Sequence, residues 1–453
     1  MNRYDKYQAS VLPWVEKIPA HWEWMRNGRL FIQHLNKVGK EYSQHQLLSL
    51  TTEGIKEKDI TDVKGKVPAS YSNYQTVNSG DMVFCLFDLD QSAVFSGISQ
   101  YDGMITSAYD VATPNSELVN ATYIDYWFRA VFAGRHYKTF AKSIRYTINF
   151  DVFKAIKSPV PPMAEQDQIV RYLDWKTSEI HRLINGLQQQ ILLLKQRNQV
   201  IIDHAVTKGI RKNRELRADK AEWMGSVPSE WLSCRMKNFF IETNVRSVDG
   251  HEPHLSMSQK KGLVTDDEDI ERRLLSESYV GGKVCQKDDL VLNRLKAHLG
   301  VFALAPMEGV ISPDYTVLHL NQDRIIPKYA EYLLRSNACR KELRTRVRGI
   351  VEGFWRLYTE DLGSIPVCLP DIDEQKEILD YVKDYEEKSN QMIGKLEKEI
   401  ELLREYRTRL ISDVVTGQMD VRNVKIPDYV PEQDDAENAL NETDIGEVDA
   451  DAE

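Results

Sequence analysis

Residues 14–22 read Trp14-Val-Glu-Lys-Ile-Pro-Ala-His-Trp22, and residues 223–231 read Trp223-Met-Gly-Ser-Val-Pro-Ser-Glu-Trp231. In both stretches two tryptophans, eight residues apart, flank an apolar residue that is followed by proline. The second copy starts 209 residues after the first. Such a specific pattern, present twice in one chain, predicts an internal duplication and therefore two copies of one structural unit.

Four further pairs of short motifs support the duplication, because they occur in the same order at offsets of 206 to 209 residues. The pairs are 80–83 with 288–291, 102–109 with 308–315, 123–126 with 329–332, and Glu165-Gln166 with Glu374-Gln375. Small changes of offset are expected when surface loops change length after a duplication. The repeat therefore covers nearly the whole chain.

Each repeat is predicted to begin with an α/β domain and to end with a long helix. Short β-type runs at 81–87, 290–295 and 315–320 accompany helical stretches at 121–133 and 328–336. Pro162 and Pro370 then suit the turn before a helix, and Glu165 and Glu374 suit its positive N-terminus. Glycines at 209 and 417 predict the two helix ends.

The two long helices repeat apolar residues at a mean spacing of 3.5, which predicts a coiled coil. The predicted core positions are Leu173, Ile180, Ile184, Leu187, Ile191, Leu194, Asn198 and Ile201, then Val382, Ser389, Ile393, Leu396, Ile400, Leu403, Arg407 and Leu410. Helices that pack only on their own domains are the alternative. Two helices of equal length in one chain favour pairing with each other.

The order of the parts predicts that this pair is antiparallel. The first helix ends where the second α/β domain begins, and the second helix begins where that domain ends, so a compact domain brings these helix ends together. We expect an α/β protein whose two homologous domains are separated by an antiparallel coiled coil with pseudo-two-fold symmetry. The predicted boundaries are 1–160 and 211–368 for the domains, 161–210 and 369–422 for the helices, and 423–453 for an acidic, disordered tail.

Three polar residues interrupt the predicted apolar seam. If the centre of the pair lies near residues 189 and 398, Asn198 faces Ser389 as a hydrogen-bonded pair, and Arg407 faces Ile180. Arg407 would then run its stem over Ile180 and present its charge to solvent or to a partner subunit. A pair of helices that splays apart at these positions is the alternative.

Composition predicts a cytoplasmic protein without a membrane span. Of 453 residues, 42% are hydrophobic, but no apolar run approaches the length of a membrane helix, and the N-terminus lacks the apolar stretch of a signal peptide. The five cysteines are isolated, which favours neither disulfides nor a zinc site. The net charge of −10 arises from the 11 acidic residues between Pro427 and Glu453, so the rest of the chain is nearly neutral.

Catalytic signatures are absent from the sequence. There is no phosphate-binding GxxxxGK loop, no GxGxxG turn, no Asn/Asp-Pro-Pro-aromatic tetrad of an amino-methyltransferase and no HxxxH or HxH pair of histidines. Residues 370–376 carry carboxylates and a lysine as a nuclease does, but the first repeat has no lysine there, so helix N-terminal charge is favoured. We expect no catalytic residue, no metal site and no bound cofactor.

A basic cluster precedes Pro162 in the first repeat and Pro370 in the second, the prolines before the two long helices. These clusters are the candidate DNA-binding residues. They comprise Arg129, Arg135, Lys138, Lys142, Arg145 and Tyr146 in the first, and Arg340, Arg344, Arg346, Arg348, Trp355 and Arg356 in the second. Arg294 and Lys296, after a predicted strand, suggest a second reading loop, whose counterpart at 85–91 is acidic. Solvated helix faces are the alternative, but the recurrence of the clusters favours duplex DNA.

These motifs resemble the DNA-specificity subunit of Type I restriction–modification systems. The resemblance rests on the doubled Trp-x-x-x-(Ile/Val)-Pro-x-x-Trp motif, on Gly103 and Gly309 in Gly-(Met/Val)-Ile-(Thr/Ser), and on the two Glu-Gln helix starts. The second helix ends Thr416-Gly-Gln-Met-Asp-Val, close to the family's helix ending, and the first helix has a looser version. The resemblance covers residues 1 to about 422.

The resemblance implies two target-recognition domains that each read one half of a bipartite DNA target, with the helices as a spacer. It also implies two methyltransferase subunits docked on the coiled coil, which use S-adenosylmethionine, and motor–nuclease subunits, which use ATP and magnesium. This chain would itself be non-catalytic. A self-contained restriction–methylation enzyme and a stand-alone DNA-binding or regulatory protein remain the alternatives.

Overall fold

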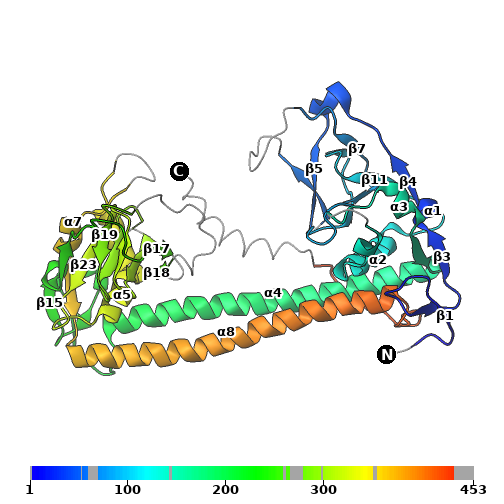
Figure 1. The fold of residues 1–453 in the computed structure, drawn as a ribbon. Helices are drawn as coiled ribbons and strands as arrows, with labels where there is room; N and C mark the ends of the chain where they lie inside the picture. Colours follow the sequence, from blue (N-terminus) through cyan, green and yellow to red (C-terminus); the bar gives the residue numbers. More distant parts are fainter. Residues whose placement is uncertain are drawn as a thin grey trace. The chain divides into compact units, whose positions relative to one another are not determined.

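The computed structural model describes residues 3–52, 54–59, 70–141, 145–258, 262–265, 279–296, 299–349 and 355–432. The chain forms two compact units, one made of residues 1–189 and 396–453 and the other of residues 190–395. Helices α4 (Met163–Lys208) and α8 (Ile372–Val415) each run from one unit into the other (Figure 1). Each unit therefore combines an α/β domain with half of each long helix.

The domain of unit 1 contains two four-stranded sheets, ordered β6-β5-β10-β7 and β4-β11-β8-β9, and two small antiparallel pairs, β1-β2 and β12-β3. Its strands are β1 (Tyr7–Ala9), β2 (Lys17–Pro19), β3 (Glu23–Arg26), β4 (Phe31–His34), β5 (Leu47–Thr51), β6 (Gly54–Lys58), β7 (Gln75–Val77), β8 (Met82–Phe84), β9 (Ser96–Ile98), β10 (Gly103–Ile105), β11 (Asp110–Pro114) and β12 (Lys157–Val160). Its helices are α1 (Asn27–Leu30), α2 (Ala121–Ala133) and α3 (Phe150–Ala155), with 3-10 turns η1 (Gly39–Gln44) and η2 (His136–Phe140).

The domain of unit 2 contains the four-stranded sheet β16-β23-β20-β21 and the pairs β13-β14, β15-β24, β17-β18 and β19-β22. Its strands are β13 (Leu216–Arg217), β14 (Val227–Pro228), β15 (Leu232–Arg235), β16 (Phe240–Thr243), β17 (Leu255–Ser258), β18 (Gly262–Thr265), β19 (Lys283–Cys285), β20 (Leu290–Asn293), β21 (Phe302–Leu304), β22 (Gly309–Ile311), β23 (Tyr315–Leu320) and β24 (Pro366–Leu369). Its helices are α5 (Pro327–Arg335), α6 (Asn337–Arg346) and α7 (Thr359–Ser364), with 3-10 turns η3 (Glu222–Met224) and η4 (Met236–Asn238).

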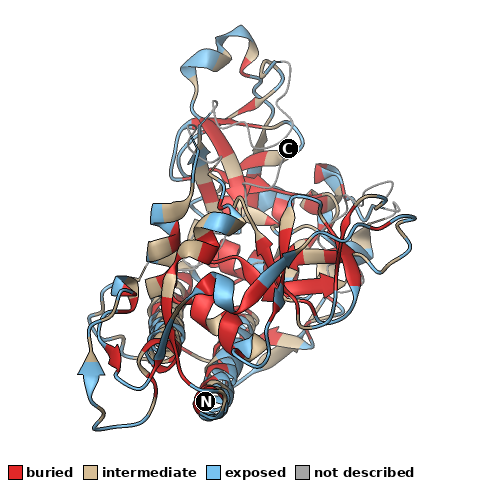
Figure 2. Cartoon of the chain, turned by 90° about the vertical axis from the view of Figure 1, so that its left-hand side faces the viewer, coloured by how far each residue is buried: buried red, intermediate tan, exposed pale blue. Residues whose placement is uncertain are grey.

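The two domains repeat the same topology, which confirms the predicted duplication of an α/β unit. The sheet β4-β11-β8-β9 corresponds strand for strand to β16-β23-β20-β21, and the pair β12-β3 corresponds to β15-β24. Even the register is repeated, because Val83 pairs with Val111 in unit 1 and Val291 pairs with Val317 in unit 2, and all four valines are fully buried. In Figure 2 the domain nearest the viewer has buried segments in its interior and exposed segments mainly along its edge.

A glycine at the start of one strand permits a close backbone approach in both domains. The amide of Met104 donates to the carbonyl of Gln46, and the amide of Val310 donates to the carbonyl of Pro253, each over 2.8 Å. A Cβ on Gly103 or Gly309 would collide with the same carbonyl oxygen. This explains why the repeated Gly-(Met/Val)-Ile motif starts with glycine.

A tryptophan joins the beginning of one long helix to the end of the other in each unit. In unit 1, Trp22 donates its indole N–H to Glu165 at the start of α4 and lies against Gly417, just beyond α8. In unit 2, Trp231 donates to Glu374 at the start of α8 and lies against Gly209, just beyond α4. The repeated helix starts and ends are therefore domain anchors.

The two long helices are antiparallel within each unit, as predicted. In unit 1, Tyr172 near the start of α4 donates to the Met419 sulfur beyond the end of α8. In unit 2, the Arg197 guanidinium lies 6.0 Å from the ring centre of Tyr385. Residues late in α4 thus meet residues early in α8.

The predicted core positions of the helix pair divide into two groups. Those buried are Leu173, Ile180, Ile184, Ile191, Val382, Ser389, Ile393, Ile400 and Leu410. Those half-buried are Leu187, Leu194, Asn198, Ile201, Leu396, Leu403 and Arg407. All of them therefore lie at least partly inside the helix pair or beneath its domains.

The predicted hydrogen-bonded pair in the seam is wrong. Within the described part of the chain, the buried Oδ1 of Asn198 and the buried Oγ of Ser389 have no hydrogen-bond partner. Arg407 does not simply extend over Ile180, because its guanidinium contacts the ring of His181. The polar positions of the seam are thus not matched to each other.

The predicted disorder from residue 423 is also wrong for its first part. The side chain of Gln168 donates to the carbonyls of Val421 and Val424. Farther along α4, Arg182 forms an ion pair with Glu432 at 3.2 Å, and Ser178 accepts from the Glu432 amide. Residues 421–432 therefore pack along α4, because these polar groups hold their backbone, and the acidic residues beyond 432 lie outside the described residues. No helix among the described segments is long and apolar enough to cross a membrane.

Candidate nucleic-acid interface

The first basic cluster begins on α2 and continues into the segment that follows it. Arg129 Nε donates to Asp125 Oδ2 over 2.8 Å, and about half of the Arg129 side chain remains exposed. Asn120 caps α2 by accepting the amides of Thr122 and Tyr123, which fixes the helix start. The cap and the buried face of α2 together position Arg129 at the surface.

Arg135 has a structural role that the sequence did not predict. It adopts a left-handed backbone conformation with φ of 51°, which ends α2. Its Nη1 donates to the Ser92 carbonyl over 2.7 Å, and its guanidinium lies 4.1 Å from the centre of the Phe132 ring. Its charge is therefore engaged in joining α2 to the loop after β8. Nearby, burial lowers the pKa of His136, so this histidine is neutral at pH 7 and adds no charge.

The exposed members of the first cluster gather beside the loop that follows β8. Lys138 lies 5.7 Å from the ring centre of Tyr146, and Arg145 is exposed. The carbonyls of Arg145 and Tyr146 accept the amides of Asp88 and Leu89, at 3.1 and 3.3 Å. The structure thus brings the basic segment onto the acidic loop 85–91; Lys142 lies outside the described residues.

Asp88 and Tyr146, which meet at this junction, both have positive φ, at 49° and 45°. Non-glycine residues rarely adopt this conformation, and it persists only where surrounding contacts hold it. The backbone bonds between the two loops supply those contacts. The loop pair therefore holds a defined shape and presents Tyr146, 39% exposed, at the surface.

In the second basic cluster, α6 carries several arginines in different environments. Arg346 forms an ion pair with Glu342 of the same helix at 2.6 Å, and Arg348 forms one with Asp361 at 2.5 Å. Arg344 is exposed, and no described carboxylate pairs with it. Arg340 is half-buried against Gly300, whose φ of 75° and missing side chain make room for it.

The reading loop predicted after β20 lies beside the second cluster. Arg294 Nε donates to the Asp314 carbonyl over 2.9 Å, and the Arg294 carbonyl accepts the amide of Leu357. Arg348 and Arg356 exchange two backbone hydrogen bonds, at 2.9 and 2.8 Å. Lys296 and Trp355 are half-buried and Arg356 is exposed. The loop after the central strand therefore meets the basic segment here, as it does in unit 1.

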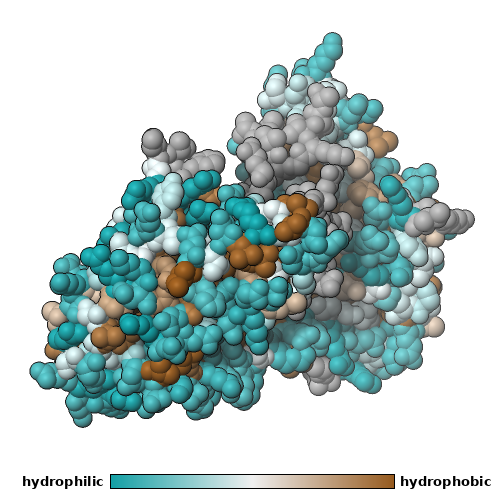
Figure 3. All heavy atoms as spheres, turned by 60° about the vertical axis from the view of Figure 1, so that its left-hand side comes forward, coloured by the Kyte–Doolittle hydropathy of each residue, from teal (hydrophilic) through white to brown (hydrophobic). Residues whose placement is uncertain are grey.

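The face of unit 2 seen in Figure 3 is mainly hydrophilic, with small separate hydrophobic patches. Such a surface suits a polyanion better than an extended apolar partner. Among the described residues, no group of three or more His, Cys, Asp or Glu side chains could hold a metal ion. The candidate site in each unit is therefore a basic surface built from one loop pair and one helix.

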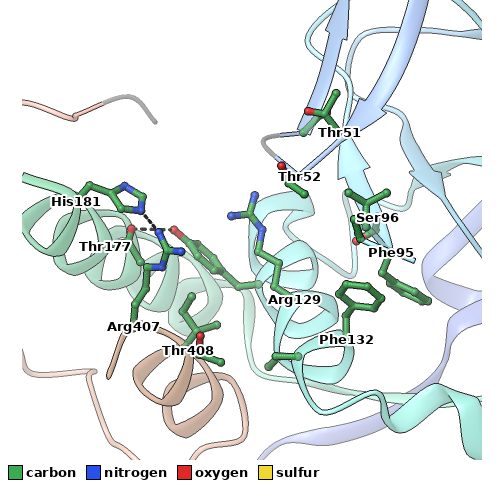
Figure 4. Close-up of a pocket in the computed structure, with 17 residues that line it drawn as sticks. Thr51, Thr52, Phe95, Ser96, Arg129, Phe132, Thr177, His181, Arg407 and Thr408 are labelled. Carbon is green, nitrogen blue, oxygen red and sulfur yellow. Dashed lines mark hydrogen bonds between the residues drawn. The ribbon is translucent and has the colours of Figure 1, made fainter. Parts of the chain in front are cut away.

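Sequence reasoning missed one group of residues in unit 1. Arg129 of α2, His181 of α4 and Arg407 of α8 line one pocket (Figure 4). The heptad pattern assigned Arg407 to the helix seam, and His181 lies next to a core position. Only the packing of α2 over the helix pair brings these residues together.

Comparison with known proteins agrees with this architecture. Residues 242–402 match the family model of the Type I restriction modification DNA specificity domain. A protein of Methanocaldococcus jannaschii that carries the name MjaX specificity subunit of a type I restriction enzyme is 22% identical over 435 residues, which cover 90% of this chain and 96% of that protein. The type I restriction enzyme MjaVIII specificity subunit of the same organism is 20% identical and covers 90% of this chain and 95% of its own length.

One solved structure, described as the structural basis of complex assembly and conformational transition of the type I R-M system, has a similar fold. Its TM-score is 0.56 at 14% identity, and the match covers 89% of this chain and 100% of that chain. The repeated sequence motifs, the duplicated domains and the relatives of matching length all agree. Residues 242–402 thus match a Type I restriction modification DNA specificity domain, and 90% of the chain is similar to specificity subunits of type I restriction enzymes.

Proposed function

We propose that this chain is the sequence-specific DNA-binding subunit of a Type I restriction–modification complex. Each unit reads one half of a bipartite target, and α4 and α8 set the distance between the halves. The observation that carries the proposal is the doubling itself: each unit presents its own basic segment and reading loop on the same scaffold. One chain with two such surfaces suits a target with two separate parts.

The two half-sites differ in sequence under this proposal. The loop after β8 carries Asp88 and Asp90, whereas the matching loop after β20 carries Arg294 and Lys296. Carboxylates accept hydrogen bonds from cytosine, whereas arginine and lysine donate to guanine. Two loops of opposite charge therefore favour different bases, and the complete target is asymmetric.

The chemistry belongs to partner subunits in this proposal. Two methyltransferase subunits dock on the coiled coil and use S-adenosylmethionine to methylate one adenine in each half-site, and motor–nuclease subunits use ATP and magnesium to cleave unmodified DNA. A base must leave the duplex before it is methylated, and a methyltransferase subunit performs this step. The missing catalytic motifs of this chain support that division of work, as does its similarity to specificity subunits.

A coordinated insertion tests the spacer role. Seven residues that continue the heptad pattern are added to α4 between 189 and 190, and seven to α8 between 395 and 396, where the two units meet along the helices. Each insertion lengthens a helix by about 10 Å, or about three base pairs of duplex. In cells with the methyltransferase, methylome sequencing should show unchanged half-sites with a longer gap. An unchanged gap would refute the spacer role.

A second experiment separates the proposal from its alternatives. The purified chain alone should bind duplex DNA without methylating or cutting it, and methyl transfer should appear when methyltransferase subunits are added. Methyl transfer by the chain alone would favour a self-contained enzyme. DNA binding without any association with a methyltransferase would favour a stand-alone DNA-binding protein.

A further inference from the structure

One aromatic residue stands at the same place in both basic clusters. Tyr146 in unit 1 and Trp355 in unit 2 are 209 residues apart, which is the offset of the repeat. Two residues after Tyr146, a backbone amide donates to the carbonyl of Leu86 in the loop after β8, over 2.9 Å. Two residues after Trp355, the corresponding amide donates to the carbonyl of Arg294 in the loop after β20, over 3.1 Å. The two aromatic residues therefore occupy equivalent backbone positions beside equivalent loops.

The residues around the two aromatic rings differ between the repeats. The loop after β8 carries two aspartates, whereas the loop after β20 carries an arginine and a lysine. The flanking residues differ as well, since residues 145–147 read Arg-Tyr-Thr and residues 354–356 read Phe-Trp-Arg. An aromatic residue is thus kept although the charge of the neighbouring loop is reversed. This indicates a task that both half-sites share, as distinct from the reading of a particular base.

The ring of Tyr146 is partly exposed, whereas its backbone is held in place. Its side chain is 39% exposed, and Lys138 Nζ lies 5.7 Å from the ring centre. Its φ of 45° is rare for a residue other than glycine, and its carbonyl accepts the amide of Leu89 over 3.3 Å. Strained backbone of this kind is found at functional sites, where neighbouring contacts impose it. A ring that served only to pack the domain would be buried.

A closed duplex offers such a ring little to stack on. The base pairs stack on one another, so a protein reaches only their edges in the grooves. The face of a base becomes accessible when a neighbouring base leaves the stack, as an adenine must before a methyltransferase acts on it. A side chain can then insert at that step, and an aromatic ring stacks on the remaining bases whatever their identity.

We propose that Tyr146 and Trp355 each fill the gap that an adenine leaves in its half-site when it is methylated. The inference rests on the proposed function, which requires one adenine to leave the duplex in each half-site. The chain supplies one matching aromatic residue in each unit. Because stacking tolerates any base, this role is compatible with two loops of opposite charge. This chain thus lowers the free energy needed to open the duplex, and the methyltransferase subunit carries out the chemistry.

The test follows methyl transfer to each half-site separately. The full chain with its methyltransferase subunits acts on the target identified by methylome sequencing, supplied as duplexes already methylated in one half-site. Transfer then reports the other half-site alone. Tyr146→Ala should slow methylation of one half-site about tenfold, because a stacking contact is lost when the duplex opens. Trp355→Ala should slow the other half-site, and Tyr146→Phe, which keeps the ring, should retain the wild-type rate.

Tyr101→Ala is the matched control for loss of a tyrosine ring. Tyr101 is also 39% exposed and lies in unit 1. It follows Ser99, whose amide donates to the carbonyl of Asp81 just before β8, whereas Tyr146 lies beside the loop that follows β8. A tyrosine at the opposite end of the strand should have no part in the gap, so this variant should methylate both half-sites at the wild-type rate.

A second measurement separates stacking in the opened duplex from ordinary contact with the closed one. For Tyr146→Ala, the fold loss in methylation rate should exceed the fold loss in duplex affinity of the chain alone by about fivefold. Equal losses of rate and affinity, equal slowing of both half-sites, or slow transfer by Tyr146→Phe would overturn the inference and leave the proposed function intact. Wild-type rates in both alanine variants would overturn it as well. Failure of the wild-type chain to bind the duplex would instead count against the proposed function.

Discussion

Trp22 donates its indole N–H to Glu165 over 3.0 Å, and 143 residues of chain separate the two. Trp231 and Glu374 form the same bond over 3.2 Å, across the same separation of 143 residues. Each tryptophan also lies against a glycine at the end of the other long helix. In each unit one tryptophan side chain therefore contacts the start of one long helix and the end of the other. These contacts hold the domain on the helix pair, although the two helix ends are far apart in the sequence.

Removing one of these glutamates should destabilise the fold strongly. Glu374 is buried and accepts hydrogen bonds from Trp231 and from Arg214, whose side chain is also buried. Glu374→Ala removes the buried partner of that arginine, which keeps only the exposed Glu230, and should lower the stability by about 1–3 kcal/mol. Denaturant unfolding measures the loss. The exposed ion pair of Arg211 with Glu377 offers the control, since Glu377→Ala should change stability little. Equal effects of the two variants would contradict the anchoring role.

The backbone at Gly309 lies so close to the Pro253 carbonyl that a side chain at position 309 should destabilise the protein. A Cβ there would lie 2.7 Å from the carbonyl oxygen of Pro253, so Gly309→Ala should lower the stability of unit 2 by about 1–3 kcal/mol. Gly394→Ala, in the same unit, should raise it by about 0.5–1 kcal/mol, because that glycine is in a helix with open space around it. Thermal unfolding distinguishes the two. A stabilising Gly309→Ala would show that the strand can shift.

The basic clusters should contact DNA phosphates. Replacing Arg344, Arg346 and Arg348 with alanine should weaken duplex binding and flatten the salt slope by up to about one unit per lost phosphate contact. Because Arg346 and Arg348 already pair with acids, we expect Arg344→Ala alone to give the largest single effect. The matching test in the first half replaces Lys138, Lys142 and Arg145. Unchanged affinity and slope in both triple variants would make these clusters solvated faces.

The unmatched polar atoms of the helix seam should reduce stability. In the described structure, Asn198 Oδ1 and Ser389 Oγ are buried without a hydrogen-bond partner, so replacing both residues with leucine should stabilise unit 2 by about 1–3 kcal/mol. The midpoint of denaturant unfolding reports the change. If the double variant also keeps its methylated target unchanged, these residues do not set the register of the helices. A loss of stability would mean that the polar pair is satisfied in solution.

Sequence alone determined the duplication, the α/β class of each half and the antiparallel direction of the helices. These features could be predicted because they depend on local periodicity and on the order of segments, both of which a single sequence records. The heptad positions of α4 and α8 followed in the same way, since an apolar residue every 3.5 positions must face a partner.

Only the tertiary structure decided what the individual polar residues do. Glu165 could be read as a helix N-terminal charge, yet it is buried beneath Trp22 and Tyr4. Arg407 contacts His181 across 226 residues, and Arg135 joins the end of α2 to the loop after β8. A charged side chain finds its partner through the packing of distant segments, and no local pattern in the sequence encodes that distance. The sequence therefore determined where the helices and domains lie along the chain, whereas the fold decided which charges are engaged and which line the pocket in unit 1.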